Sequence, residues 1–570
     1  MTQLIERIRE AVIGERQGVE TPFGRKPLVY ADYTASGRSL SFIEDYIRDH
    51  VLPYYANTHT ETSFTGAQTT ALREEARNEI RRAVNGGDED KVIFCGPGAT
   101  AAINKLMDIL NLRLPHDLAE RCDLEQHIPL SERPVIFVGP YEHHSNELPW
   151  RESIADVVSI PLNEKGQIDL QVLENELVQH ADRPLRIGSF SAASNVTGIR
   201  SDVVRMTALL KQHGALAFWD YAAAAPYVGI DMNGESPIDA VFISPHKFVG
   251  GPGTPGVLVV KSQVLNNSVP AVVGGGTVLY VTPQDHRFLD DAERREEGGT
   301  PAIVESIRAG LVFKLQQQVG TDVIEAREKR FVQRALARLA DCPELDILGN
   351  RHAERISILS LRFRHGDRDL HYGFVVSLLN DLFGIQVRGG CSCAGPYGHA
   401  LLNMDMDYSR ALEKEIRAGA MILRPGWVRL NFNYFISEQE FEYLLGAIEL
   451  VAKHGWRLLP HYVFDTKAGV WRFEGRSMEL PVRLADVDFM PAEASRAVEH
   501  LALCGKLACA ERELLAERSI PVIRPLGLSS GADRLRWFLL PEDVVDKLHG
   551  AQKGAQPDQQ TEQQQVPASV

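Results

Sequence analysis

Hydrophobic positions in the first half of the chain alternate between helical and strand-like spacing. Four apolar residues between Leu72 and Val84 recur at four-residue steps and predict a helix over Thr69–Val84, which two glycines then end. Short apolar runs bounded by turns predict buried strands at Lys91–Phe94, Val135–Val138, Leu185–Phe190, Leu216–Trp219, Ala240–Ile243 and Gly256–Val260. This alternation favours an α/β fold with a mainly parallel sheet.

The pattern changes after about Pro301. A long helical stretch over Ile303–Leu339 leads into a second α/β-like segment, which predicts a smaller domain. A hairpin (VFDTKAGVWRF) and a helical run over Pro491–Arg518 follow, and the Gln-rich end is expected to be disordered because it has few apolar groups. The predicted division is an N-terminal helical segment (1–25), a large domain (26–302), a small domain (303–454), a C-terminal extension (455–548) and a disordered tail (549–570).

Composition and charge limit the choice of partners and compartment. Among 570 residues, 61 basic and 76 acidic side chains give a net charge of −15, which argues against nucleic acid or an anionic membrane as the main partner. Seven cysteines are an odd, sparse set, so we expect reduced thiols rather than a disulfide framework. The N-terminus lacks the apolar core of a signal peptide, and no apolar run is long enough to span a bilayer. We therefore expect a soluble, cytoplasmic protein.

The most informative segment is ISPHKFVGGPGTPGVLVV. A predicted strand ends at Ser244, His246 and Lys247 follow, and a glycine-rich turn leads into the next strand. A lysine that forms a Schiff base needs such a position at the end of a rigid element. Taken alone, Lys247 would more often be a surface lysine in a turn, and the motifs around it decide between the two interpretations.

A carboxylate gives the lysine a chemical partner. Asp220 ends the apolar strand of ALAFWDYAAAAPY, where an unpaired carboxylate would be costly to bury. A carboxylate at this place can keep the ring nitrogen of pyridoxal 5′-phosphate (PLP) protonated, so that the ring accepts carbanion electrons. Asp220 is also a good N-cap for the alanine-rich run that follows, and both interpretations can hold. Together, Asp220 and Lys247 predict a PLP enzyme with the cofactor on Lys247.

A strand, a glycine turn and a helix start in IFCGPGATAAINKL offer backbone N–H groups to a phosphate. Gly98, Ala99 and Thr100 are the candidate ligands, with the Thr100 hydroxyl as an added donor. The motif is not a P-loop, because no Gly-Lys-Ser/Thr follows.

Two further segments supply candidates for contacts with the cofactor ring. In YEHHSNELPW, either His143 or His144 can stack on the ring. The pair would also suit a metal ion, but the sequence shows no matching third ligand, so we expect no metal site. In SFSAASNVTGIR, Asn195 lies just past a strand end, where it can hydrogen-bond the ring oxygen or simply form a turn.

In this order, the motifs resemble the class V aminotransferase family of fold-type I PLP enzymes, and most closely its cysteine desulfurase and selenocysteine lyase branch. The resemblance runs from about Val29 to about Lys453. It implies a large domain with a mainly parallel sheet flanked by helices, a smaller α/β domain and an additional C-terminal block. It assigns Lys247 to the Schiff base, His246, Ser244 and Thr100 to the phosphate, His143 to ring stacking, Asp220 to the pyridinium and Asn195 to the ring hydroxyl.

The resemblance also implies a homodimer. The segment Glu297–Pro301 (EGGTP) is similar to the loop that reaches a phosphate across a dimer interface, so Thr300 would serve the second subunit's site. One departure concerns the ring oxygen: typical desulfurases follow the aspartate with Gly-Ala-Gln, whereas Ala223 stands at the glutamine position here. We expect the cofactor to bind still, with a different electronic tuning. The sulfurases that serve the molybdenum cofactor are similar in lacking that glutamine.

The segment IQVRGGCSCAGPYGHALL would define the reaction. Arg388, Gly390 and Cys393 match the Arg-x-Gly-x-x-Cys pattern of desulfurases, and Cys391 makes a Cys-x-Cys that resembles the molybdenum-cofactor sulfurase loop. The chemistry needs a thiolate that attacks the substrate's sulfur and takes it as a persulfide, which leaves alanine. An inert or regulatory cysteine pair stays open, as does the choice between the two thiols.

Two arginines are candidates to hold the substrate carboxylate, because a guanidinium fits carboxylate geometry. They are Arg388 and Arg429, and Arg429 is more similar to the family's bidentate clamp. The leading hypothesis is therefore an enzyme that removes sulfur from a small amino acid and passes it to an acceptor protein. The runner-up is an aminotransferase, epimerase or β-lyase that uses Lys247 and PLP without Cys393; a non-enzymatic scaffold is the third.

Overall fold

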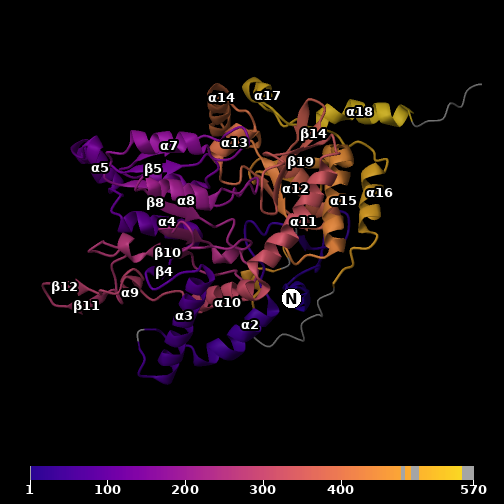
Figure 1. Cartoon of the computed structure of the whole chain (residues 1–570). Coiled ribbons are helices and arrows are strands. Elements are labelled where there is room, and N and C mark those ends of the chain that lie inside the picture. Colours follow the sequence, from indigo (N-terminus) through magenta and orange to yellow (C-terminus); the bar gives the residue numbers. More distant parts are fainter. Residues whose placement is uncertain (1, 59, 477–479, 481, 490–499, 555–570) are drawn as a thin grey trace, which may run out of the picture.

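The computed structural model describes residues 2–58, 60–476, 480, 482–489 and 500–554. A seven-stranded sheet, called the large sheet, forms the centre of the first half of the chain (Figure 1). Its strands, in spatial order, are β4 (Asp90–Phe94), β10 (Val257–Lys261), β9 (Ala240–Ile243), β8 (Leu216–Asp220), β7 (Arg186–Ser191), β5 (Val135–Val138) and β6 (Asp156–Ser159). Only β10 runs antiparallel to its neighbours. The predicted mainly parallel α/β sheet is therefore confirmed.

Helices cover both faces of the large sheet, because its buried strands present apolar side chains to both sides. On one face, Ile103 and Leu106 of α4 (Gly98–Ile109) pack with Phe218 of β8. On the other face, Trp219 of β8 lies in a cluster with residues from several helices, among them α2 (Ser41–Tyr46), α3 (Phe64–Ala83), α7 (Leu170–Gln179), α8 (Val203–Gln212) and α10 (Ile303–Val319). Two short helices complete this part, α5 (His116–Cys122) and α6 (Leu148–Arg151).

A second, antiparallel sheet, called the small sheet, follows. It has the order β13 (Leu345–Ile347), β14 (Ile358–His365), β18 (Trp427–Asn431) and β17 (Arg388–Gly390), with β15 (Arg368–Leu370) beside β14. Its helices are α11 (Thr321–Leu339), α12 (Tyr372–Phe383), α13 (Gly395–Leu401), α14 (Met406–Arg417) and α15 (Glu438–His454). Phe374 of α12, Leu430 of β18 and Phe441 of α15 share one apolar core there. This core is separate from the two that flank the large sheet.

The N-terminal segment and one hairpin lie outside these sheets. The segment contains α1 (Thr2–Ala11), β1 (Gly18–Val19), β2 (Lys26–Pro27) and β3 (Val29–Tyr30); the hairpin is β11 (Val278–Val281) with β12 (His286–Phe288), followed by α9 (Ala292–Arg295). Strand β3 pairs in parallel with β16 (Ile385–Gln386), more than 300 positions later. This pairing brings the start of the chain to the edge of the small sheet.

The C-terminal block, from residue 455 onward, packs into the core of the small sheet. The predicted hairpin is present as β19 (Tyr462–Asp465) and β20 (Val470–Phe473). Helices α16 (Lys506–Leu515), α17 (Ser530–Arg534) and α18 (Pro541–Gly554) follow, and Leu514, Phe538 and Val544 join the same apolar cluster as α12. Figure 1 shows α17 beside α14 and α18 near β14.

Several predicted boundaries were wrong for identifiable reasons. Helix α3 begins at Phe64 rather than Thr69, because Ser63 caps it by accepting from the Gly66 amide, a signal outside the apolar repeat. The helical stretch 303–339 is two helices, since Gly320 at φ +83° separates them. In the run 491–518, residues 490–499 lie outside the described residues, and the rest is helical only within α16. Helix α18 continues to Gly554, into the predicted tail, whose residues 555–570 are not described.

Candidate active site

One cavity collects nearly all the predicted site residues. Its volume is about 860 Å³, and it lies between strand ends of the large sheet and the β17–β18 edge of the small sheet. Its walls include Gly98, Ala99, Thr100, His143, Asn195, Asp220, Ser244, His246, Lys247, Arg388, Cys393 and Arg429. It does not include Thr300, nor His144, the alternative to His143.

Lys247 and Asp220 meet because their strands are neighbours. Strands β8 and β9 run in parallel, with Asp220 paired to Phe242, so both carboxyl ends open onto the cavity. Lys247 ends a 3-10 turn (Pro245–Lys247) just beyond β9. Burial lowers the pKa of Lys247 to about 8, and Asp220 offsets part of the shift. Burial also raises the pKa of Asp220, against the opposing effects of the Ala222 amide and Lys247. The two groups are therefore buried at one cavity, and the charge of each favours the charged form of the other.

The glycine turn before α4 forms a cradle beside this pair. Gly98 has φ +57°, and a Cβ on it would lie 3.0 Å from both Ser244 Oγ and His246 Cε1. The Ala99 amide donates to Ser244 Oγ at 2.9 Å, while the exposed Thr100 hydroxyl lies 2.6 Å from Ser145 Oγ. A strand, a tight turn and the positive end of a 12-residue helix thus converge at one wall, as an anionic group requires.

His143 and His246, the two histidines that line the cavity, are neutral in this environment. Burial is the main cause that lowers the pKa of His143 to about 3, and Lys247 adds to it. His143 Nδ1 accepts from the Ser145 amide at 3.1 Å, which fixes the ring. Burial likewise lowers the pKa of His246 to about 4. Neither ring adds positive charge to the cavity near neutral pH.

Asn195 connects the cavity to the thiol loop. Its Nδ2 donates to the Ser392 carbonyl at 2.7 Å, and its own carbonyl accepts from Arg429 at 3.1 Å. Its side-chain oxygen Oδ1 is buried without a hydrogen-bond partner among the described residues. One unsatisfied polar atom therefore remains at the cavity, which a bound group can satisfy.

The thiol loop, residues Cys391–Cys393, lines the cavity with both cysteines exposed. Ser392 and Cys393 both lie in the left-handed region at φ +55°, although neither is glycine. The amide of His144 donates to the Cys393 carbonyl at 2.8 Å, and His144 Nε2 accepts from the Gly395 amide at 3.0 Å. The histidine pair thus holds both the cofactor side and the thiol side of the cavity, a role that the sequence did not reveal for His144.

The two predicted arginines share a carboxylate that sequence reasoning missed. Arg429 Nη2 lies 3.2 Å from Asp32 Oδ1, and Arg388 Nε lies 3.1 Å from Asp32 Oδ2. Arg429 is almost fully buried, whereas the Arg388 side chain is 57% exposed. Burial lowers the pKa of Arg429, and Asp32 offsets only part of this effect. The one available signal was that Asp32 follows a short apolar strand, but its partners depend on the β3–β16 pairing.

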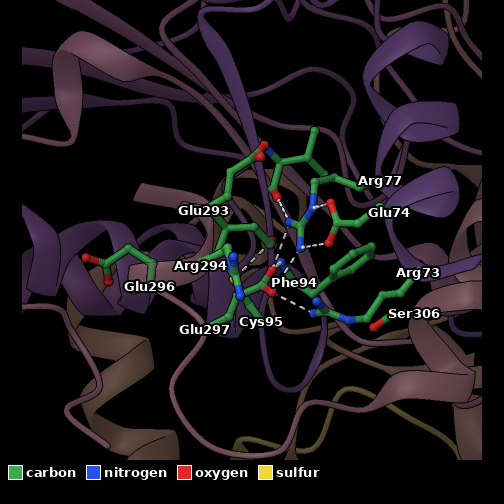
Figure 2. A network of polar contacts seen from close by, with 12 residues as sticks. Arg73, Glu74, Arg77, Phe94, Cys95, Glu293, Arg294, Glu296, Glu297 and Ser306 are labelled. Atoms are coloured by element: carbon green, nitrogen blue, oxygen red, sulfur yellow. Dashed lines mark hydrogen bonds and ion pairs between the residues drawn. The ribbon is translucent and has the colours of Figure 1, made fainter. Parts of the chain in front are cut away.

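Thr300 lies away from the cavity, exposed on the loop after α9. Figure 2 shows how that loop is anchored: Glu297 accepts from Arg73 at 2.6 Å, from Arg77 at 3.0 and 3.1 Å and from the Phe94 amide at 2.7 Å. Glu296 accepts from Asn267 and the Ala271 amide nearby. The position suits a residue that serves a second subunit, which stays a prediction.

Two negative findings concern the described part of the chain. No group of three or more His, Cys, Asp or Glu side chains there is arranged to hold a metal ion. Nor is any of its helices long and apolar enough to cross a bilayer.

The fold is that of fold-type I PLP enzymes. A cysteine desulfurase from Thermococcus onnurineus NA1 matches it with a TM-score of 0.61 at 23% identity, over 75% of this chain and 95% of that one. The cysteine desulfurase CsdA from Escherichia coli matches with a TM-score of 0.58 at 22% identity, over 74% and 94%. The aminotransferase class-V family model matches residues 29–444, and the chain belongs to this family, whose members are PLP-dependent enzymes.

Relatives in sequence agree with this assignment. A probable cysteine desulfurase of Halalkalibacterium halodurans is 29% identical over 374 residues, which covers 65% of this chain and 85% of the relative. Another, from Streptomyces coelicolor, is 28% identical over 373 residues, covering 65% and 84%. The C-terminal block lies beyond the residues that the family model matches.

The cavity fits the cofactor of this family. It offers a buried amine on Lys247, a buried carboxylate on Asp220 and a glycine cradle at Gly98. The unpartnered Asn195 Oδ1 adds a polar contact. Its volume also lies within the range of about 300–1,000 Å³ that is typical of small-molecule sites.

Proposed function

We propose that the chain is a cysteine desulfurase-like enzyme that takes sulfur from cysteine as a persulfide on Cys393 and releases alanine. One observation carries the proposal: the Cys-x-Cys loop lines the same cavity as the buried Lys247 and Asp220. The names of the sequence relatives, probable cysteine desulfurases, support it. Selenocysteine is the related substrate, since selenium would occupy the place of sulfur.

PLP would be held covalently by Lys247, with Asp220 facing the ring nitrogen and His143 against the ring. The bound cofactor supplies an electron sink for negative charge at the substrate's α-carbon. The phosphate would lie at the glycine cradle, near Gly98, Ala99, Thr100, Ser244 and His246. Asn195 would face the ring oxygen, although its Nδ2 donates to Ser392 in this structure, so it offers Oδ1 or must exchange partners.

Lys247 is the group in the cavity best suited to move a proton. Its pKa of about 8 leaves about a tenth of the amine neutral at pH 7, far more than the ordinary lysine value allows, so Nζ can take the α-proton of the substrate and later return a proton. His143 stays neutral, which lets it pack against an aromatic ring without bringing a charge into the cavity.

Arg429 and Arg388 would bind the substrate carboxylate by exchanging it for part of their contact with Asp32. Cys393 lines the same cavity as Arg429 and contributes to its pKa, so this thiol lies close to the proposed carboxylate site. Cys393 is therefore preferred over Cys391 as the sulfur acceptor. The Cys393 sulfur would attack the substrate sulfur, forming an S–S bond as the substrate C–S bond breaks, and the released carbon takes a proton to give alanine.

Assembly follows the same proposal. Thr300 would reach the phosphate of a second subunit, so the working unit is a homodimer, and the mobile sulfur would pass to an acceptor protein. The cofactor would lie in the domain spanning 26–302 and the thiol loop in the domain spanning 303–454.

The deciding experiment compares wild type, Cys393→Ser and Cys391→Ser with cysteine as substrate. Alanine, sulfide and pyruvate are quantified together, and intact-protein mass reports the added sulfur. We expect Cys393→Ser to lose both persulfide and alanine, and Cys391→Ser to keep both. Unchanged alanine release from Cys393→Ser would refute the sulfur-transfer step, and pyruvate with sulfide as the main products would indicate one of the alternatives, a β-lyase.

A further inference from the structure

The wall of the cavity beside Cys391 has a chemistry that the proposed reaction does not use. Tyr372, at the start of α12, and Arg424, before β18, both line this wall. Burial is the main cause that raises the pKa of Tyr372 to about 12. Cys391 raises this pKa further, and Arg424 lowers it. The Tyr372 hydroxyl is therefore protonated and can donate a hydrogen bond at any pH near neutral.

Arg424 differs from the other two arginines of the cavity. Arg388 and Arg429 are both paired with Asp32, whereas no carboxylate among the described residues lies within ion-pair distance of Arg424. The Tyr372 hydroxyl likewise has no hydrogen-bond partner in the described part of the chain. A free guanidinium and a free hydroxyl thus stand together next to a thiol.

The Tyr372 ring is packed tightly between its neighbours. A Cβ on Gly389 would lie 2.7 Å from Tyr372 Cδ2, and one on Gly426 would lie 2.8 Å from Cε1, so the ring fills the space that two glycines leave. On its other side, Trp537 lies nearly parallel to it, at 15° and with ring centroids 6.1 Å apart. Trp537 also donates its Nε1–H to the Leu423 carbonyl at 3.1 Å, directly before Arg424.

Trp537 belongs to the C-terminal block, which the family match does not include. The backbone around it is fixed, because its carbonyl accepts from the Asp369 amide at 3.1 Å and the Leu539 amide donates to the Asp369 carbonyl at 2.9 Å. A segment outside the residues that the family model matches therefore contacts both the Tyr372 ring and the residue directly before Arg424.

We propose that Tyr372 and Arg424 form an oxyanion subsite that binds a second acidic group of a small ligand beside the thiol loop, with Trp537 as its positioning residue. The inference rests on the proposed function. The acidic group has two possible sources: the side chain of an acidic amino acid that enters the cavity in place of cysteine, or a small acidic thiol that takes the sulfur. Both present the same carboxylate-like chemistry to the guanidinium.

Calorimetry on the PLP-loaded, full-length chain, without oxygen, separates the two sources. Aspartate against alanine tests the substrate source, and 3-mercaptopropionate against 2-mercaptoethanol tests the acceptor source. We expect the acidic member of one pair to bind about tenfold more tightly, the size of a charge-assisted hydrogen bond at a partly exposed site. Arg424→Gln should abolish that preference, Arg424→Lys should keep part of it, and Tyr372→Phe should reduce it.

Trp537→Ala should reduce the preference as well, and Trp537→Phe should restore it, which separates positioning from a general loss of folding. Arg410→Gln, an exposed arginine on α14, is the matched control and should leave both ratios unchanged. No preference in either pair for wild type, or equal behaviour of Arg424→Gln and Arg410→Gln, would overturn the subsite. Binding does not depend on turnover, so a failed desulfurase assay would count against the proposed function alone.

Discussion

Two of the places where one carboxylate lies between two arginines differ in the balance of their charges. At the α9 loop, Glu297 is clasped by Arg73 and Arg77, with all three side chains nearly inaccessible to solvent (Figure 2). At the cavity, Asp32 lies between the buried Arg429 and the half-exposed Arg388. The first cluster joins helix α3 to the loop that carries Thr300, and the second faces the space proposed for the substrate.

The charge balance distinguishes the two clusters. Burial alone would lower the pKa of Arg77, but Glu297 outweighs it and the pKa lies above its ordinary value. Burial lowers the pKa of Arg429, and there Asp32 fails to compensate. Glu297 and Glu74 together compensate for the burial of Arg77, whereas the charge of Arg429 is under-compensated and a further anion would stabilise it. The same arrangement of a carboxylate between two arginines is thus structural at Glu297 and suits ligand binding at Asp32. The difference is whether the carboxylates compensate for the burial of the arginine.

The largest effect is expected at the Glu297 cluster. Glu297→Gln keeps the shape but leaves the buried Arg73 without a countercharge and Arg77 with only the half-exposed Glu74, which should lower the free energy of unfolding by about 3–5 kcal/mol. A lower midpoint of urea unfolding at pH 7 measures the loss.

Glu438→Gln is the matched control, because Glu438 also lies between two arginines, Arg330 and Arg334, but is 51% exposed. Its loss should stay within about 1 kcal/mol. Equal losses in the two variants would show that burial does not set the contribution of the Glu297 cluster.

Much of the site is predictable from sequence because its chemistry follows strand ends. Asp220 and Lys247 each come directly after an apolar run, and neighbouring parallel strands bring such positions to one edge of a sheet. The glycine turn at Gly98 has its own local signature. Predicting these residues requires no information about contacts between distant segments.

The parts that were missed depend on contacts between distant segments. Asp32 reaches Arg388 across 356 positions through a two-residue pairing that no local pattern marks. Tyr372 and Arg424 carry no motif, and the segment that braces them lies in a block without a familiar pattern. The helix break at Gly320 was missed because apolar spacing continues across it. Local periodicity predicts elements and strand ends, and it leaves their partners undetermined.

A smaller effect is expected when the comparison is tested through catalysis. Arg429→Lys keeps the charge but loses the planar fork, so kcat/KM for alanine release from cysteine should fall between about tenfold and hundredfold. The kcat/KM of Arg388→Lys should fall less, because the Arg388 side chain is largely exposed to solvent. Steady-state kinetics gives both values, and urea unfolding of each variant should stay near wild type. If Arg429→Lys instead lowers the unfolding midpoint as much as Glu297→Gln and spares kcat/KM, the two clusters play the same structural role.

The smallest effect is a pH dependence that belongs to the Glu297 cluster. Burial alone would raise the pKa of Glu297, but Arg77 and Arg73 outweigh it and the pKa lies below the ordinary 4.5. A depressed carboxyl pKa contributes stability that is complete above the unfolded value and is lost as pH falls through the folded value. The difference in unfolding free energy between wild type and Glu297→Gln should therefore stay constant from pH 7 to about 4.5 and then narrow, by at most about 1.4 kcal/mol per pH unit. Urea titrations at half-unit pH steps measure it, and a difference that narrows already between pH 7 and 5 would mean that the arginines do not hold Glu297 ionised.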